Sequence, residues 1–152
     1  MVDKKDVPIV HLQMVRDSLV PYGEMQLNTS EKAVKVMRDF LGDMDREYVV
    51  VVCLDNCLKP TYIQIVGIGT LNACLISVPG IFKTAILSNA SGLLMFHTHP
   101  SGGVIPSRDD ITMTRKIREA GNMLDIPLHD HIILGVVGNY FSFKNSDLWD
   151  AA

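Results

Sequence analysis

An unbroken apolar run, EYVVVVCLD, occupies residues 47–55. Its four consecutive valines have strong β propensity, and a strand without polar alternation is typical of burial on both faces. A second run, LLMFHTH at residues 93–99, has a similar apolar character. Both runs therefore predict central strands of a sheet.

The segments around these runs alternate between strand and helix patterns. Residues 7–17 are rich in β-branched side chains and include Pro8, which predicts an edge strand. Residues 61–72 predict another strand. Near the C-terminus, residues 129–137 and 140–143 flank Gly138-Asn139, a two-residue hairpin signal. The alternation predicts an α/β or α+β class built on one mixed sheet.

Three segments carry helical periodicity. Residues 28–43 predict a helix that Asn28 or Ser30 caps and Gly42 ends. Residues 79–92 predict a second helix with Gly92 past its end, and Ser107 opens a third through a capping box with Asp110. The expected apolar faces are Ile81, Phe82, Ala85 and Ile86 on the second helix, and Ile111, Thr114, Ile117, Met123 and Leu124 on the third.

Composition fits one compact domain, residues 1–152, with 47% hydrophobic and 20% charged residues. No apolar run approaches the ~20 residues of a membrane span, and the charged N-terminus lacks a signal-peptide pattern. These features predict a soluble, cytoplasmic protein with no membrane partner. The net charge of -3 does not support a nucleic-acid partner. Cys53, Cys57 and Cys74 are too few for a disulfide framework, so we expect buried or inert thiols.

The stretch MFHTHPSGGVIPSRDD, residues 95–110, has the pattern of a metal site. His97 and His99 are two apart on a strand, so their side chains share a face while Thr98 points the other way. Asp110 follows on the first turn of the third helix, where the helix dipole favours a carboxylate. Catalytic zinc uses three protein ligands and an open water position. The predicted ligands of one Zn²⁺ are therefore His97, His99 and Asp110.

Two simpler interpretations stay open at this point. An HxH pair can be no more than the polar tip of a core strand, and Ser107 and Asp110 can serve only as helix caps. His129-Asp130-His131 is a second HxH, but no further acidic residue follows it until Asp147. A compact third ligand is thus missing, and supporting or strand-end roles suit this second pair better.

The stretch from residue 97 resembles the RadC proteins of the JAB/MPN superfamily, whose JAMM zinc motif is HxH, seven residues, Ser, two residues, Asp. His97, His99, Ser107 and Asp110 fit every position. The resemblance implies a mixed β-sheet flanked by helices, as in JAB/MPN and cytidine-deaminase-like domains. It also implies hydrolysis of a peptide or isopeptide bond, with Glu47 as general base and Ser107 supporting the oxyanion.

The chain departs from the RadC pattern at several places. Pro79-Gly80 stands where the family usually has Arg-Glu at the start of the second helix. Thr98 replaces the common Asn between the motif histidines, and His129 replaces an apolar residue. We expect a short, stand-alone form without the N-terminal helix-hairpin-helix region of longer RadC proteins.

Three functions remain in consideration. The first is a zinc-dependent metallohydrolase that acts on a peptide or protein substrate. The second is a non-catalytic, metal-stabilised interaction module. The third is a DNA-associated repair accessory protein, as the family's historical label suggests, and the basic residues that would contact phosphates lie on the third helix: Arg108, Arg115, Lys116 and Arg118. A solvated helix face explains these four residues better, because the chain as a whole is acidic. The sequence leaves the oligomeric state open.

Overall fold

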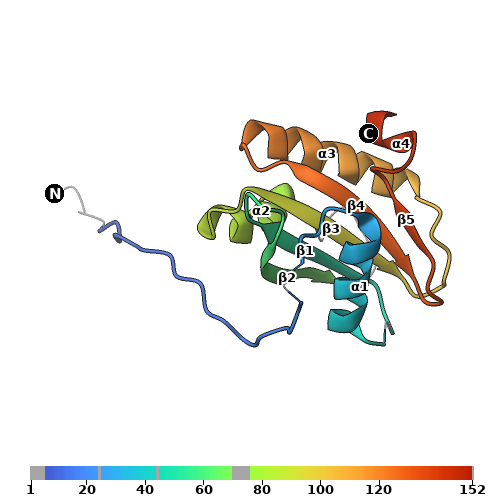
Figure 1. The fold of residues 1–152 in the computed structure, drawn as a ribbon. Helices are drawn as coiled ribbons and strands as arrows, with labels where there is room; N and C mark the ends of the chain where they lie inside the picture. Colours follow the sequence, from blue (N-terminus) through green and yellow to red (C-terminus); the bar gives the residue numbers. More distant parts are fainter. Residues whose placement is uncertain (1–5, 24, 44, 70–75, 152) are drawn as a thin grey trace.

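The centre of the fold is a five-stranded sheet with the strand order β2-β1-β3-β4-β5 (Figure 1). The computed structural model describes residues 6–23, 25–43, 45–69 and 76–151. Strands β3 and β4 are parallel, and the other neighbours are antiparallel, so the predicted mixed sheet is confirmed. The strands are β1 (Tyr48–Leu54), β2 (Pro60–Ile68), β3 (Gly92–His99), β4 (Leu128–Gly135) and β5 (Tyr140–Ser142). The helices are α1 (Ser30–Leu41), α2 (Val78–Leu87), α3 (Arg108–Met123) and α4 (Leu148–Ala151).

Helices cover both faces of the sheet. Alternate residues of β1 point to opposite faces, so Val50 and Val52 belong to the core under α1. Val49 and Val51 belong instead to the core that includes residues of α2 and α3. All of β1 from Val49 onward is buried. This two-sided burial confirms the prediction from the valine run and explains why that run has no polar alternation.

The topology places the HxH segment beside two other chain segments. Parallel strands need a crossover connection, and α3 supplies it between β3 and β4. The first turn of α3 therefore follows the loop at the C-terminal end of β3. Strand β1 runs antiparallel to β3, with Val49 opposite His97. The residues that precede β1 consequently lie at this same end of the sheet.

The beginning of α1 differs in detail from the prediction. Thr29 is the N-cap, and its Oγ1 accepts a hydrogen bond from the backbone N–H of Lys32. The Ser30 hydroxyl instead donates to the Asp130 carboxylate, 3.0 Å away, inside the protein. The sequence does not distinguish the hydroxyl that caps the helix from the neighbouring hydroxyl that has a buried partner. Gly42 ends the helix with a φ of 59°, as predicted.

Three predicted helix features are wrong. Helix α2 ends at Leu87 with Ser88 as its C-cap, and Gly92 opens β3 instead of following the helix. Ile86 is half exposed, although it was placed on the buried face. Met123 and Leu124 are 85% and 42% exposed, although Gly121 in the last turn of α3 is buried. The residues that α3 buries include Met113, Thr114 and Ile117.

The predicted edge strand at residues 7–17 is also wrong. Residues 6–23 form no helix or strand and extend away from the domain (Figure 1). Val7, Ile9 and Leu19 are each at least 84% exposed. High β propensity describes how a residue fits a pleated surface, and it creates no strand without a neighbouring edge to pair with.

The structure also tests the predictions for the hairpin, the cysteines and a membrane span. The hairpin is confirmed, since β4 and β5 pair across a turn in which Gly138 has a φ of 72°. Of the cysteines expected to be buried or inert, Cys53 is buried and Cys57 is exposed. Cys74 and the predicted strand residues 70–72 lie outside the described residues. Within the described ranges, no helix has the length and apolar character that a membrane crossing needs.

Candidate metal centre

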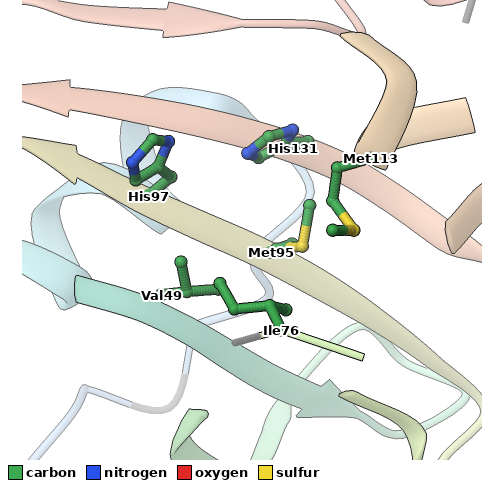
Figure 2. Close-up of a pocket in the computed structure, with 6 residues that line it drawn as sticks. All are labelled: Val49, Ile76, Met95, His97, Met113 and His131. Carbon is green, nitrogen blue, oxygen red and sulfur yellow. The ribbon is translucent and has the colours of Figure 1, made fainter. Parts of the chain in front are cut away.

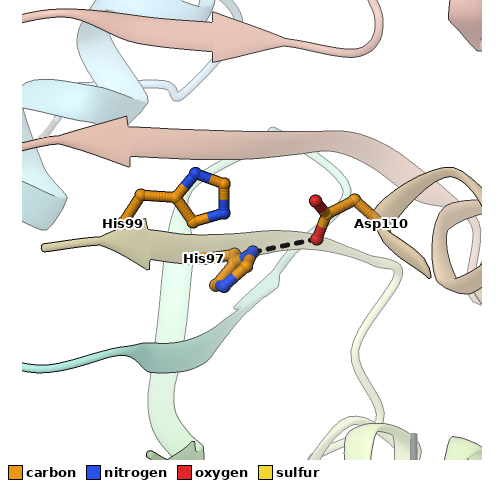
Figure 3. Close-up of side chains that lie close together, drawn as sticks. All are labelled: His97, His99 and Asp110. Atoms are coloured by element: carbon orange, nitrogen blue, oxygen red, sulfur yellow. Dashed lines mark ion pairs between the residues drawn. The ribbon is translucent and has the colours of Figure 1, made fainter. Parts of the chain in front are cut away.

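His97 and His99 occupy the C-terminal end of β3, where the strand leaves the sheet (Figure 3). His97 is buried and His99 is partly exposed. Their ring centroids are 4.4 Å apart and the ring planes are perpendicular. The predicted sharing of one strand face is confirmed.

Asp110 is part of a complete capping box at the start of α3. Its Oδ2 accepts hydrogen bonds from the backbone N–H of Ser107 at 2.7 Å and from the Ser107 hydroxyl at 2.6 Å. The Asp110 backbone N–H donates to the same Ser107 oxygen at 3.1 Å. Capping therefore uses only one carboxylate oxygen of Asp110. The structural role and a ligand role are compatible, because Oδ1 remains.

The remaining oxygen faces His97 (Figure 3). Asp110 Oδ1 and His97 Nδ1 are 3.1 Å apart, and both side chains are buried. This ion pair is the polar contact of both atoms, whereas His97 Nε2, also buried, has no hydrogen-bond partner within the described part of the chain. Leaving such a buried polar atom unsatisfied costs about 1–3 kcal/mol, so the arrangement indicates a ligand.

The three predicted ligands fit a single zinc ion. One ligand atom each from His97, His99 and Asp110 lie within 4.8 Å of one another. Zinc–ligand distances of ~2.0–2.2 Å in a tetrahedron separate the ligands by roughly 3.3–3.6 Å. The His97–Asp110 pair is close to this range, and the two imidazoles and one carboxylate are typical zinc donors. No other metal-binding group of this kind occurs among residues 6–23, 25–43, 45–69 and 76–151.

The Asp110 carboxyl is held in its ionised form. Burial alone would raise its pKa, but the His97 imidazole and the Ser107 hydrogen bonds outweigh burial and keep the pKa well below its usual range. The N-terminus of α3 acts in the same direction, because the helix dipole stabilises a negative charge there. Asp110 is therefore negatively charged over the whole physiological pH range, as a metal ligand must be.

A hydrogen bond fixes the tautomer of His99. Its Nδ1 lies 2.7 Å from the carbonyl oxygen of Gly103. A carbonyl can only accept, so Nδ1 carries the hydrogen and Nε2 keeps its lone pair for a metal. The loop that connects the histidines to Asp110 thus also orients one of the ligands.

His131 approaches the centre from β4, which agrees with the supporting role that the sequence favours for the second HxH pair. It lines a narrow gap in the packing together with His97 and four apolar side chains, Val49, Ile76, Met95 and Met113 (Figure 2). Burial, together with the nearby His97, lowers the pKa of His131 to about 3. His131 is therefore a neutral neighbour of the ligands.

The second HxH does not form a metal site. Asp130 points away from His131, across the sheet, where it accepts hydrogen bonds from Ser142 at 2.6 Å and Ser30 at 3.0 Å. Burial raises the pKa of this carboxyl. His129 lies where the β3–β4 register shifts, against Gly92. The low ranking of this triplet is confirmed, because its side chains are divided between different surroundings.

Glu47 lies immediately before β1 and is partly buried. Val49, two residues further on, pairs with His97 of β3. The carbonyl of Glu47 accepts a hydrogen bond from the backbone N–H of Gly69 at 2.9 Å. Glu47 is thus at the same end of the sheet as the predicted ligands.

The family model of the RadC-like JAB domain matches residues 27–148, which include all of these residues. The chain belongs to the RadC-like JAB domain family. A UPF0758 protein of Roseiflexus castenholzii is 34% identical over 139 residues, covering 90% of this chain and 59% of the relative. A UPF0758 protein of Thermotoga maritima is 38% identical over 119 residues, covering 78% of this chain and 53% of the relative. The chain spans about half the length of the curated relatives it matches.

One departure from the RadC pattern has a structural explanation. Thr98, in the place of the family's common Asn, is fully buried and directs its hydroxyl to the backbone before β1. At the start of α2, Ser77 caps the helix through the backbone N–H of Gly80, at 3.2 Å. A side chain that the RadC family carries at Gly80 is thus absent without loss of the cap.

The basic residues of α3 are not equivalent in this RadC-like domain. Arg118 stacks its guanidinium 4.2 Å from the ring centroid of Trp149 and also donates to the Trp149 carbonyl. Arg108, Arg115 and Lys116 are exposed. One of the four cations that were candidates for phosphate contacts therefore anchors the C-terminal segment instead.

Proposed function

We propose that this RadC-like domain is a zinc-dependent hydrolase of peptide or isopeptide bonds. The observation that carries the proposal is the buried ion pair of His97 Nδ1 and Asp110 Oδ1, 3.1 Å apart, beside His99, together with a buried His97 Nε2 that has no hydrogen-bond partner among the described residues. Three protein donors with room for one more ligand are typical of catalytic zinc, whereas structural zinc has four. The JAMM spacing of the family supports the same reading.

The chemistry divides between the ion and the protein. Bound zinc supplies a Lewis acid for a carbonyl oxygen and lowers the pKa of water toward ~7. The protein holds the donors: Asp110 stays ionised, and His99 keeps Nε2 available through its bond to Gly103. The ligands come from a strand end and a helix start, so the geometry is rigid before a substrate binds.

Glu47 is proposed as the group that moves protons. Its place supports this role, because Glu47 lies two residues before Val49, which pairs with His97 of β3. The carboxylate would hold a proton from water at an Oε atom and release it to the leaving amine. A single glutamate suffices for both transfers.

Ser107 is proposed to act mainly through Asp110. Its hydroxyl hydrogen is directed at Asp110 Oδ2, 2.6 Å away. Support of a developing oxyanion, which the family resemblance implies, would need this hydroxyl to turn from the carboxylate to the substrate. In the present arrangement Ser107 orients the ligand and stabilises its charge.

Metal content tests the first half of the proposal. We expect about one zinc per chain in protein purified without a metal-affinity tag or chelator, measured by elemental analysis. The His97→Ala variant should lose the metal, while the matched His129→Ala variant should keep it, because His129 belongs to the second HxH. Equal metal in both variants would contradict the site.

Activity tests the second half. We expect Glu47→Gln to retain zinc and to lose peptide or isopeptide hydrolysis against a diverse peptide library. An interaction module, the alternative function, predicts instead that Glu47→Gln preserves every measurable property of the protein. A peptide or protein substrate and a cytoplasmic location remain predictions. The exposed basic residues of α3 are consistent with a solvated helix surface, so we propose no nucleic-acid role.

A further inference from the structure

Thr98 lies between the two histidine ligands, but its side chain points to the opposite face of the sheet. The Thr98 hydroxyl accepts a hydrogen bond from the backbone N–H of Tyr48 at 2.8 Å. It donates its hydrogen to the backbone carbonyl of Arg46 at 3.0 Å. These two peptide groups are the ones that flank Glu47. A single fully buried side chain thus holds the backbone on both sides of the proposed general base.

The backbone of Glu47 is also held from the other neighbouring strand. The N–H of Gly69, just after β2, donates to the Glu47 carbonyl at 2.9 Å. With both flanking peptides bonded to Thr98 and the carbonyl bonded to Gly69, the direction of the Glu47 Cα–Cβ bond is fixed. It is fixed relative to β3, the strand that carries His97 and His99.

We infer that Thr98 is a positioning residue that sets the distance between Glu47 and the metal centre. The inference rests on the proposed hydrolase function and extends it to a residue that touches neither metal nor substrate. The same segment of β3 then carries two ligands on one face and the support of the proton carrier on the other. One strand end defines the whole geometry.

The inference also accounts for a family difference. Asn, common at this position in RadC proteins, offers one acceptor and a donor on its amide, as the threonine hydroxyl does. Either residue can bridge a backbone N–H and a backbone carbonyl. Valine has the shape of threonine without this capacity, so it removes the two hydrogen bonds and little else.

An ordinary structural role must be distinguished from positioning. Thr61 supplies the comparison, since its hydroxyl donates to the Cys53 carbonyl of β1 at 3.1 Å. It is a strand threonine with a bond to the neighbouring strand, but it lies at the other end of β1 from Glu47. Thr61→Val is therefore the matched control for Thr98→Val.

The test uses Co²⁺ as the probe in the full chain. Paramagnetic relaxation of the Glu47 side-chain carboxyl carbon, followed by NMR, reports its distance from the ion and falls with the sixth power of that distance. A displacement of roughly 1 Å, which can cost about 100-fold in catalysis, lowers this relaxation severalfold. We expect that loss in Thr98→Val and not in Thr61→Val, Thr98→Ser or Thr98→Asn. Co²⁺ affinity should stay within about threefold in all four variants, since no ligand contact changes.

The outcomes separate this inference from the proposed function. If wild-type Glu47 shows no enhancement, the assignment of Glu47 as general base fails. If wild type and Thr98→Val show the same enhancement, positioning by Thr98 is overturned while the base assignment stands. Should Thr98→Val not fold, Thr98→Ala leaves space for a water and is measured instead, with the same two readings. Faster hydrogen exchange of the Tyr48 amide confirms that the bond was removed.

Discussion

The Nδ1 atom of His131 lies 2.7 Å from Oγ1 of Thr114, and both side chains are buried. The Thr114 hydroxyl also donates its hydrogen to the Asp110 carbonyl, 2.7 Å away. A hydroxyl has one hydrogen, so Thr114 must accept from His131, which therefore carries its proton on Nδ1. A chain of two hydrogen bonds thus links β4 to the turn of α3 that presents the Asp110 ligand.

This buried imidazole predicts a pH dependence of folding. The pKa of His131 is lowered to about 3 by burial and the nearby His97, whereas an unfolded histidine has a pKa of about 6.5. The unfolded state binds more protons between these values, so stability is complete above about pH 6.5 and falls as the pH decreases. We expect metal-free protein to lose about 1.4 kcal/mol between about pH 7.5 and 5.5, measured by urea unfolding.

Two asparagine variants test which histidine causes this loss of stability. His131→Asn keeps a donor near Nδ1 but does not titrate, so its stability should be nearly constant over the same pH range. Burial also lowers the pKa of His129, which is only half-buried, so His129→Asn should retain most of the wild-type slope. Identical slopes in wild type and His131→Asn would show that another group is responsible.

Ser107 both caps α3 and supports the proposed ligand Asp110, and these two effects can be measured separately. Loss of an N-cap hydroxyl typically costs about 1 kcal/mol of stability. Ser107→Ala also removes a hydrogen bond to Asp110 Oδ2, and loss of such support lowers metal affinity by about 10–100-fold. We expect both losses, the first by urea unfolding and the second by zinc competition with a chromophoric chelator.

The N-cap of α1 provides the control. Thr29 accepts from the Lys32 backbone N–H, and α1 lies on the opposite face of the sheet from Asp110. Thr29→Ala should therefore reduce stability by a comparable amount and leave zinc affinity unchanged. Equal zinc affinities in the Ser107→Ala and wild-type proteins would limit Ser107 to capping.

The ligand residues could be predicted because their relationships are local. A spacing of two on a strand places His97 and His99 on one face, and a capping box places Asp110 on the first turn of α3 whatever the rest of the chain does. The supporting residues could not be predicted in this way. Thr98 finds its partners about 50 residues away in the chain, and His131 meets Thr114 across 17 residues, through contacts that only the folded sheet creates.

The errors in the fold have a related origin. Met123 is apolar, but it lies on the same side of α3 as the exposed Lys116 and Glu119, where no surface covers it. Residues 7–17 have the composition of a strand, but a strand also needs an edge to pair with, and composition carries no information about that edge. Both errors concern a partner surface rather than the segment itself.

Asn139, in the β4–β5 turn, reaches the loop that orients His99. Its Nδ2 donates to the Gly102 carbonyl at 2.8 Å, and the next carbonyl, that of Gly103, accepts from His99 Nδ1. The Arg38 guanidinium of α1 holds the backbone carbonyl of Asn139 at 2.9 Å. Arg38 therefore anchors the turn, and the Asn139 side chain supports the loop between His99 and Asp110.

Removing the Asn139 amide should loosen His99 without unfolding the domain. We expect Asn139→Ala to weaken zinc binding by about 10-fold, as for other groups that orient metal ligands. The stability of the metal-free protein should change by less than about 0.5 kcal/mol, because Asn139 is exposed. Asn122→Ala, at an exposed position on α3, is the matched control and should alter neither quantity. If the two variants bind zinc equally well, the loop holds His99 without help from the turn.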